Sequence, residues 1–132
     1  MESAATPAAG PVALSTLGQI GITVTDLDRA TTFYRDTLRI QFLFQVPNLA
    51  FFDCGGVRLM LSLAEKSGEQ FSSILYFKVP DIQAAYQAIR GRGAVFEGEP
   101  HLVAPMPTYD LWMAFFRDPD RNLLALMSEV SR

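Results

Sequence analysis

The chain has 132 residues, of which 49% are hydrophobic and 19% are charged, and its formal net charge is −3 at pH 7. This length has room for one domain or for two small modules that share a sheet, and no apolar run approaches the roughly 18 residues that a membrane span needs. Lys and Arg are scattered along an acidic chain, which excludes the basic face that nucleic acid requires. We therefore expect the partner to be a small organic molecule, and neither a membrane nor a nucleic acid.

The first fifteen residues and the cysteine content give information on the cellular compartment of the protein. Residues 1–15 are rich in Ala, Pro and Ser but lack the basic and apolar segments of a secretory signal, so we expect a flexible tail there and a single domain over residues 16–132. Cys54 is the single cysteine, so the chain can form neither an internal disulfide nor a multi-cysteine metal site. This cysteine usage fits a reducing cytoplasm.

A strand and helix pattern occurs twice in the chain. The segment QIGITVTDLDRATTFY, residues 19 to 34, returns in weaker form as ILYFKVPDIQAAYQAI, residues 74 to 89. In each copy an apolar run predicts a strand, and Asp26 or Asp81 stands where a helix N-cap would accept backbone N–H bonds. Apolar residues at three-and-four spacing then predict one buried helix face. The chain is therefore expected to use one strand–cap–helix unit twice.

Hairpin and turn signals follow each predicted helix. In module one, residues 17–63, we expect three more strands, over residues 40–45, 49–54 and 57–63. Residues 64–70 are polar and contain Gly, which predicts a linker to module two, residues 71–130. There we expect strands over residues 95–103, 109–117 and 123–130, with a tight turn from Asp118 to Asn122 before the last of them. The predicted fold class is α+β, with the order βαβββ used twice.

Two motifs in this pattern resemble those of the vicinal oxygen chelate superfamily, which includes glyoxalases, bleomycin resistance proteins and extradiol dioxygenases. The first is V-x-D-L followed by F-Y-R-D-x-L, and the second is F-x-D-P-D, here Phe116 to Asp120. The resemblance implies curled mixed sheets around a shared cavity and often two chains per assembly, so we expect a glyoxalase-like homodimer. The family commonly has Gly after D-P-D, where this chain has Arg121, and a left-handed backbone angle there would carry strain.

The resemblance also implies where a metal would be held. In the metal-dependent members the ligands are normally His and Glu on the first and last strands of each module, and the matching positions here are Gln19, Met60, Ile74 and Ala125. Of these four side chains only the Gln amide is a hard donor, and the Met thioether is soft. We therefore expect neither a metal nor another cofactor.

Strand alternation assigns side chains to the cavity. If Gln19 points into it, Arg58 and Met60 do so as well, and Tyr76 and Lys78 follow in module two. This assignment places no Asp or Glu on the same faces, so we expect a cavity of positive or neutral potential.

Two functions remain open from the sequence. One is a metal-independent protein that binds a small, neutral or anionic, aromatic molecule, held by the ligand-binding residues Gln19, Arg58, Met60, Tyr76, His101 and Trp112. In this hypothesis Trp112 forms a stacking wall, although an aromatic strand is also typical of a core. The other is a metal-independent isomerase, lyase or hydrolase of a small carbonyl compound. In it the single histidine, His101, is the catalytic base, and Gln19 or Tyr76 donates a hydrogen bond to the developing charge.

Overall fold

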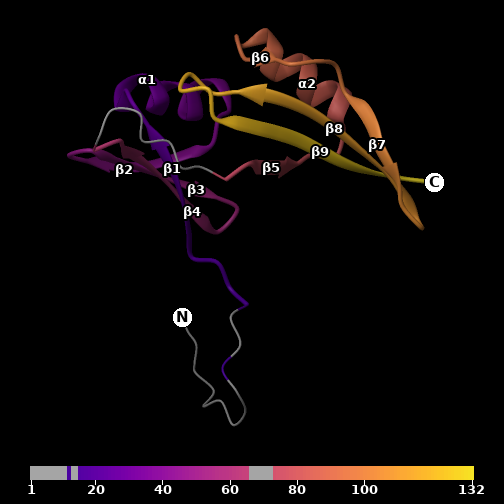
Figure 1. The fold of residues 1–132 in the computed structure, drawn as a ribbon, viewed down its shortest axis with the longest axis horizontal. Coiled ribbons are helices and arrows are strands. Elements are labelled where there is room, and N and C mark those ends of the chain that lie inside the picture. Colours follow the sequence, from indigo (N-terminus) through magenta and orange to yellow (C-terminus); the bar gives the residue numbers. More distant parts are fainter. Residues whose placement is uncertain (1–11, 13–14, 66–72) are drawn as a thin grey trace.

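The computed structural model describes residue 12 and the ranges 15–65 and 73–132. In these ranges the chain forms two open, mixed sheets, and α1 and α2 lie on the same side of them (Figure 1). The expected tail over residues 1–15 and the expected linker over residues 64–70 fall largely outside the described residues. No helix in the described part of the chain is long and apolar enough to cross a membrane.

The first sheet contains four strands in the spatial order β1 (Gln19–Val24), β4 (Val57–Leu63), β3 (Leu49–Cys54) and β2 (Gln41–Val46). β1 runs parallel to β4, and the other neighbours are antiparallel. Helix α1 (Leu27–Thr32) continues directly into the π-helical segment η1 (Phe33–Thr37), which the sequence did not predict. A π-turn adds one residue to a helical turn, and here the Leu38 N–H closes it by donating to the Phe33 carbonyl at 3.0 Å.

The second sheet repeats the arrangement with the order β5 (Leu75–Lys78), β9 (Leu123–Ser131), β8 (Tyr109–Arg117) and β6 (Val95–Phe96), and β7 (His101–Pro105) also pairs with β8. Helix α2 (Ile82–Gly91) connects β5 to β6. The prediction of a single strand over residues 95–103 is wrong, because the chain forms two separate strands there, β6 and β7. Pro100 lies between them, and proline has no amide hydrogen for a strand ladder.

The predicted repeat is confirmed in both pairing and capping. β5 runs parallel to β9 as β1 does to β4. The carboxylate of Asp26 accepts the Arg29 N–H at 3.0 Å, and the carboxylate of Asp81 accepts the Ala84 N–H at 3.1 Å. Both aspartates have the extended backbone of an N-cap residue. The chain is therefore an α+β protein of two related modules, with the order βαβββ in module one and βαββββ in module two, where the expected second strand is divided into β6 and β7.

Both modules contribute to one hydrophobic core beneath the helices. Side chains that are fully or almost fully buried come from module one, such as Ile22, Tyr34 and Phe52, and from module two, such as Phe116 and Leu124. A module of this size buries too little apolar surface to be stable alone. The shared core therefore supports the expectation that the two halves need each other.

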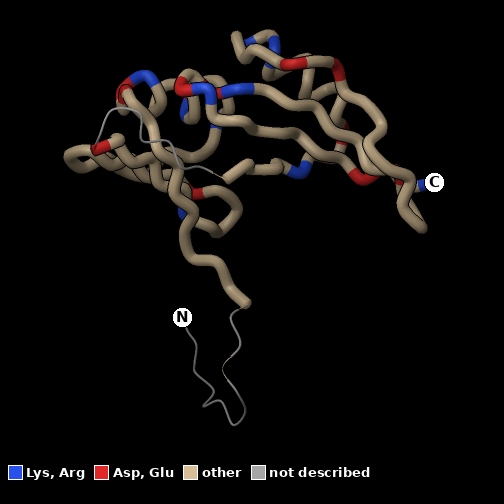
Figure 2. Tube along the Cα trace, viewed as in Figure 1, with Lys and Arg blue, Asp and Glu red and all other residues tan. Residues whose placement is uncertain are grey.

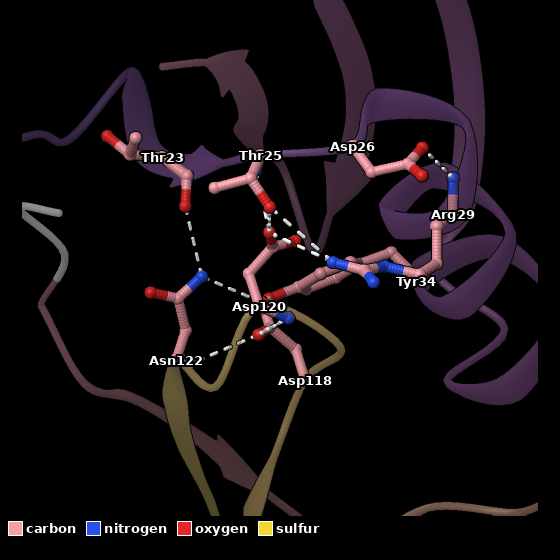
Figure 3. A network of polar contacts seen from close by, with 8 residues as sticks. All are labelled: Thr23, Thr25, Asp26, Arg29, Tyr34, Asp118, Asp120 and Asn122. Atoms are coloured by element: carbon pink, nitrogen blue, oxygen red, sulfur yellow. Dashed lines mark hydrogen bonds and ion pairs between the residues drawn. The ribbon is translucent and has the colours of Figure 1, made fainter. Parts of the chain in front are cut away.

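A polar network also joins the modules, and it centres on Asp118 in the turn between β8 and β9 (Figure 3). The Tyr34 phenol donates to Oδ2 of Asp118 at 2.8 Å, and Nδ2 of Asn122 donates to the same oxygen at 2.8 Å. Oδ1 of Asp118 accepts the backbone N–H groups of Asp120 and Asn122, both at 2.8 Å. Burial, and then the Asp118 carboxylate, raises the pKa of Tyr34 far above its usual range, so the phenol stays a hydrogen-bond donor.

Asp120 extends this network to the junction of β1 and α1. Its Oδ1 accepts the Thr25 N–H at 2.6 Å and also the Thr25 hydroxyl, and the Arg29 guanidinium lies 3.3 Å away (Figure 3). Nδ2 of Asn122 donates to the Thr23 carbonyl at 3.1 Å. The sequence predicted Asp118 as a turn residue. The structure shows that this turn also links module two to module one through hydrogen bonds.

Arg121 occupies the left-handed conformation in this turn, with φ of 69°. The turn has therefore kept the backbone angle that the family's usual glycine would adopt. For a residue with a Cβ atom, this conformation costs about 1–2 kcal/mol. Arg39 has a similar angle, with φ of 59°.

Candidate functional site

Within the described ranges, each sheet has one face that no helix covers, and strand pairing identifies the side chains on that face. In module one, Gln19 pairs with Arg58, and Met60 pairs with Phe51. The intervening Leu59 is buried in the core with 2% of its surface exposed. Because side chains alternate along a strand, Gln19, Arg58 and Met60 lie together on the uncovered face, as the alternation predicted.

The contacts on this face are those of a surface suited to organic molecules. Nε2 of Gln19 lies 3.5 Å from Sδ of Met60, and the guanidinium carbon of Arg58 lies 5.7 Å from the centroid of the Phe51 ring. Phe44 stacks on Phe51 with the ring centroids 4.7 Å apart, and 45% of Phe44 is exposed. The sequence analysis did not select either phenylalanine. Both add aromatic area beside the Arg58 cation.

In module two, Tyr76 and His101 lie on the uncovered face with Phe115 between them. Tyr76 on β5 and Phe115 on β8 are the cross-strand neighbours of Ala125, which lies on β9 between them. The centroid of the Phe115 ring lies 6.5 Å from that of the Tyr76 ring and 6.3 Å from that of the His101 ring. Nδ1 of His101 is 3.2 Å from the Glu99 carbonyl oxygen, which can only accept. A hydrogen bond at this contact has Nδ1 as its donor, and in the tautomer that this requires Nε2 is the acceptor nitrogen.

A pocket of about 330 Å³ lies at the seam between the two modules. Arg58 from β4 and Tyr76 from β5 line it, together with apolar side chains such as Ile20, Ile74 and Phe77. Among the described residues that line the pocket, Arg58 alone carries a charge, and it forms no ion pair with a carboxylate in the described ranges. The structure thus brings together one predicted site residue from each module. His101 instead lines a separate pocket of about 210 Å³ with Phe115, Glu97 and Glu99.

Trp112 does not lie on this surface, so the expectation that it forms a stacking wall, with Gln19 or His101 as the orienting polar group, is wrong. It pairs with Ser128, which is 1% exposed, and it packs against the core on the helix-covered face. There it lines a groove at the start of α2 with Ile82. Alternation explains the placement, because Trp112 is three residues from Phe115 and the two side chains leave the strand on opposite faces.

The expectation that these faces hold no acidic residue is also wrong. Glu129 shares a face with the other cavity-side residues of β9, and its carboxylate lies 3.2 Å from Nζ of Lys78. Asp53 pairs directly with Arg58 across β3 and β4. Lys78 is therefore an ion-paired residue rather than a free cation for a ligand.

The positions that the resemblance implies for metal ligands do not fit a hard divalent cation. Gln19 and Met60 contact each other, whereas Ile74 and Ala125 have no donor atoms in their side chains. One amide and one soft thioether are too few donors for such an ion. No group of three or more His, Cys, Asp or Glu side chains suited to a metal occurs within the described residues.

Cys54 also borders the seam pocket. Burial, and then the Asp53 carboxylate, raises the pKa of its thiol. A thiol in this state is protonated at neutral pH and is a poor nucleophile. Cys54 therefore contributes apolar surface to the pocket.

The repeated capped units, the two open sheets and the D-P-D turn define a class of protein. The chain belongs to the Glyoxalase/Bleomycin resistance protein/Dioxygenase superfamily, whose family model matches residues 16–126. Uncharacterized protein YraH from Bacillus subtilis (strain 168) is 31% identical over 123 residues, which cover 82% of this chain and 94% of that protein.

Solved structures show the same relationship. A member of the superfamily from Sphaerobacter thermophilus is 26% identical with a TM-score of 0.70, and the match covers 88% of this chain and 98% of that one. Lactoylglutathione lyase from Agrobacterium tumefaciens is 21% identical with a TM-score of 0.69, over 87% of this chain and 94% of that one. At that identity the likeness shows a shared fold alone.

Proposed function

We propose that this protein binds a small, flat, neutral or anionic organic molecule in the seam pocket without a metal ion. The observation that carries the proposal is the meeting of Arg58 and Tyr76 in one largely apolar pocket of about 330 Å³. Small-molecule sites are usually apolar concavities with a few well-placed polar groups, and their volumes begin at about 300 Å³. The pocket thus suits a ligand of about one aromatic ring with a polar substituent.

Each lining residue has a role in this proposal. The Arg58 guanidinium offers a planar fork of N–H donors to a carboxylate and a flat face for an aromatic ring. Tyr76 offers a ring edge and a phenol that can donate or accept a hydrogen bond. Gln19 and Met60 do not line the pocket. They lie beside Arg58 on the adjoining uncovered face, where an amide and an adaptable apolar side chain extend the surface next to the pocket.

We propose in addition that the protein is a cytoplasmic homodimer. Phe44 and Tyr76 expose 45% and 47% of their surfaces on the uncovered faces, and exposed apolar area of this kind is typical of an interaction surface. A second copy placed there would cover both residues and close the seam pocket from water. Sedimentation equilibrium tests the proposed dimer, and a chain that stays monomeric at high micromolar concentration would contradict it.

Three probes of similar shape and different charge test the ligand chemistry. Benzoate and benzamide should raise the melting temperature in a concentration-dependent way, and benzylammonium should not. A ligand at a hundred times its dissociation constant stabilises the fold by about 2.7 kcal/mol. Arg58→Gln should remove the advantage of benzoate over benzamide, whereas Arg35→Gln, which removes the same charge from an exposed position outside the pocket, should keep it. Stabilisation by benzylammonium alone, or an equal response of both variants, would refute the proposal.

Metal independence has its own test. Because Gln19, Met60, Ile74 and Ala125 supply no set of hard donors, prolonged treatment with a chelator should leave the melting temperature unchanged. Elemental analysis that found about one transition metal per chain in the purified protein would contradict this expectation.

A second candidate function is proton abstraction from a small carbonyl compound by an isomerase, lyase or hydrolase. It is favoured by the position of His101 and Tyr76 on the same face, where the His101 imidazole would act as the base and the Tyr76 phenol would donate a hydrogen bond to the developing charge. Exchange of the methyl protons of pyruvate in heavy water, followed by NMR, tests it. Acceleration that is lost in His101→Gln would support the enzyme, and an equal rate in both proteins would exclude it.

A further inference from the structure

A second groove lies on the helix side of the molecule, beside the turn between β8 and β9, and the function proposed above does not use it. Its volume is about 390 Å³. Phe33 of η1 contributes one wall from module one, and the turn, β8 and the segment after α2 contribute the rest from module two. Apolar surface from Phe33, Val95 and Pro119 lies close to the guanidinium groups of Arg117 and Arg121.

The charges of this groove are unequally compensated. Nε of Arg117 is 2.5 Å from the Glu97 carboxylate, so these two residues neutralise each other. Asp118 is 4% exposed, and both of its oxygens are occupied by four hydrogen bonds. Arg121 is exposed and forms no ion pair with any carboxylate in the described ranges. Figure 2 shows acidic and basic positions side by side along this turn, whereas the middles of β8 and β9 carry no charge.

The backbone holds Arg121 firmly in this place. Its N–H donates to the Asp118 carbonyl at 2.9 Å, and its own carbonyl accepts from the Arg117 guanidinium at 3.1 Å. With φ of 69°, it adopts a conformation that a residue with a Cβ atom keeps only when its surroundings impose it. Residues in such backbone conformations cluster at functional sites. The strained backbone of Arg121 therefore suggests that its side chain, at the edge of this groove, contacts a ligand.

We propose that this groove is a second binding site, which takes a small aliphatic carboxylate. The carboxylate lies on the planar fork of Arg121, because guanidinium and carboxylate form paired, charge-assisted hydrogen bonds. Arg117 is paired with Glu97 and holds Arg121 in place through the hydrogen bond to its carbonyl. The aliphatic part packs on Phe33, Val95 and Pro119. A ligand in this position contacts both modules at once.

NMR titration of the amide signals with butanoate tests the site, with butanamide as the neutral molecule of the same shape. Butanoate should cause saturable shifts at Gly93 and Val95, and butanamide should not. Arg121→Gly should weaken butanoate binding about tenfold or more, because it removes a hydrogen-bonded charge. Since glycine adopts a positive φ freely, this variant should fold at least as well as the original chain.

Arg39→Gly is the matched control. It removes the same charge from the other arginine with a positive φ, which does not line the groove, and it should change butanoate binding by less than about twofold. Arg58→Gln should leave the shifts at Gly93 and Val95 unchanged, which separates this site from the seam pocket. The proposal is overturned if butanoate causes no saturable shift, if butanamide binds equally well, or if Arg121→Gly and Arg39→Gly behave alike.

Discussion

The hydrogen bond between Tyr34 and Asp118 allows a quantitative test of the link between the modules. Tyr34→Phe removes one hydroxyl from a ring that is 0% exposed and leaves the packed volume almost unchanged. Asp118 then keeps three of its four hydrogen bonds. A hydrogen bond to a charged group contributes about 1.5–3 kcal/mol, and because three donors remain we expect a loss of about 2 kcal/mol.

Urea denaturation followed by circular dichroism at pH 7 measures this loss, with the dependence on urea concentration unchanged. For a chain of this length, 2 kcal/mol corresponds to a fall in melting temperature of roughly 6 °C. Tyr109→Phe is the matched control, because the Tyr109 hydroxyl has no hydrogen bond in the described structure, and its effect should stay within about 0.5 kcal/mol. If Tyr34→Phe were as mild as this control, the buried link would not contribute to stability as argued.

Three further predictions follow from the same structure. First, the raised pKa of Tyr34 means that the folded chain keeps a proton which the unfolded chain loses above pH 10.0, so stability falls as the pH rises through that value. The advantage of the original chain over Tyr34→Phe should shrink by about 1 kcal/mol between pH 10 and pH 11 in unfolding experiments, and a constant advantage would contradict this. Second, Arg121→Gly relieves a left-handed angle that costs about 1–2 kcal/mol, but it adds about 0.5–1 kcal/mol of unfolded-state entropy. We therefore expect a net gain of about 0–1.5 kcal/mol in urea unfolding, and a clear destabilisation would be incompatible with strain. Third, Val79→Ile adds a methyl group to an apolar cavity of about 130 Å³ between the modules and should raise the free energy of unfolding by about 0.8 kcal/mol. Val95→Ile, at a position that is 71% exposed, is the control and should change this free energy little. A lower free energy of unfolding in Val79→Ile would mean that the cavity has no room for the methyl group.

The repeated unit could be predicted from the sequence because its signals are local. Asp26 and Asp81 each cap a helix within three residues, and the parity of β1 and β4 follows from alternation once Gln19 is placed. Trp112 was misplaced because β8 has aromatic residues on both faces, and their abundance does not say which face is covered. Applying alternation to β8 as well would have selected Phe115 instead.

The seam pocket and the polar network could not be predicted in the same way. The turn from Asp118 to Asn122 follows a local pattern, but its partners Tyr34 and Thr25 are 84 and 95 residues away from the aspartates that they contact. Arg58 and Tyr76 meet because of how two separately patterned modules pack. No periodicity within either module contains that information.

These long separations have a consequence for the speed of folding. Contacts between residues so far apart require most of the chain to be ordered first, so the turn should reach β1 and α1 only after each hairpin and helix has formed. Interactions that are absent from the folding transition state affect the rate of unfolding and hardly affect the rate of folding. The contacts of Asp118 and Asp120 should therefore control how long the native molecule persists before it opens, while the local hairpins and helices control how quickly it forms.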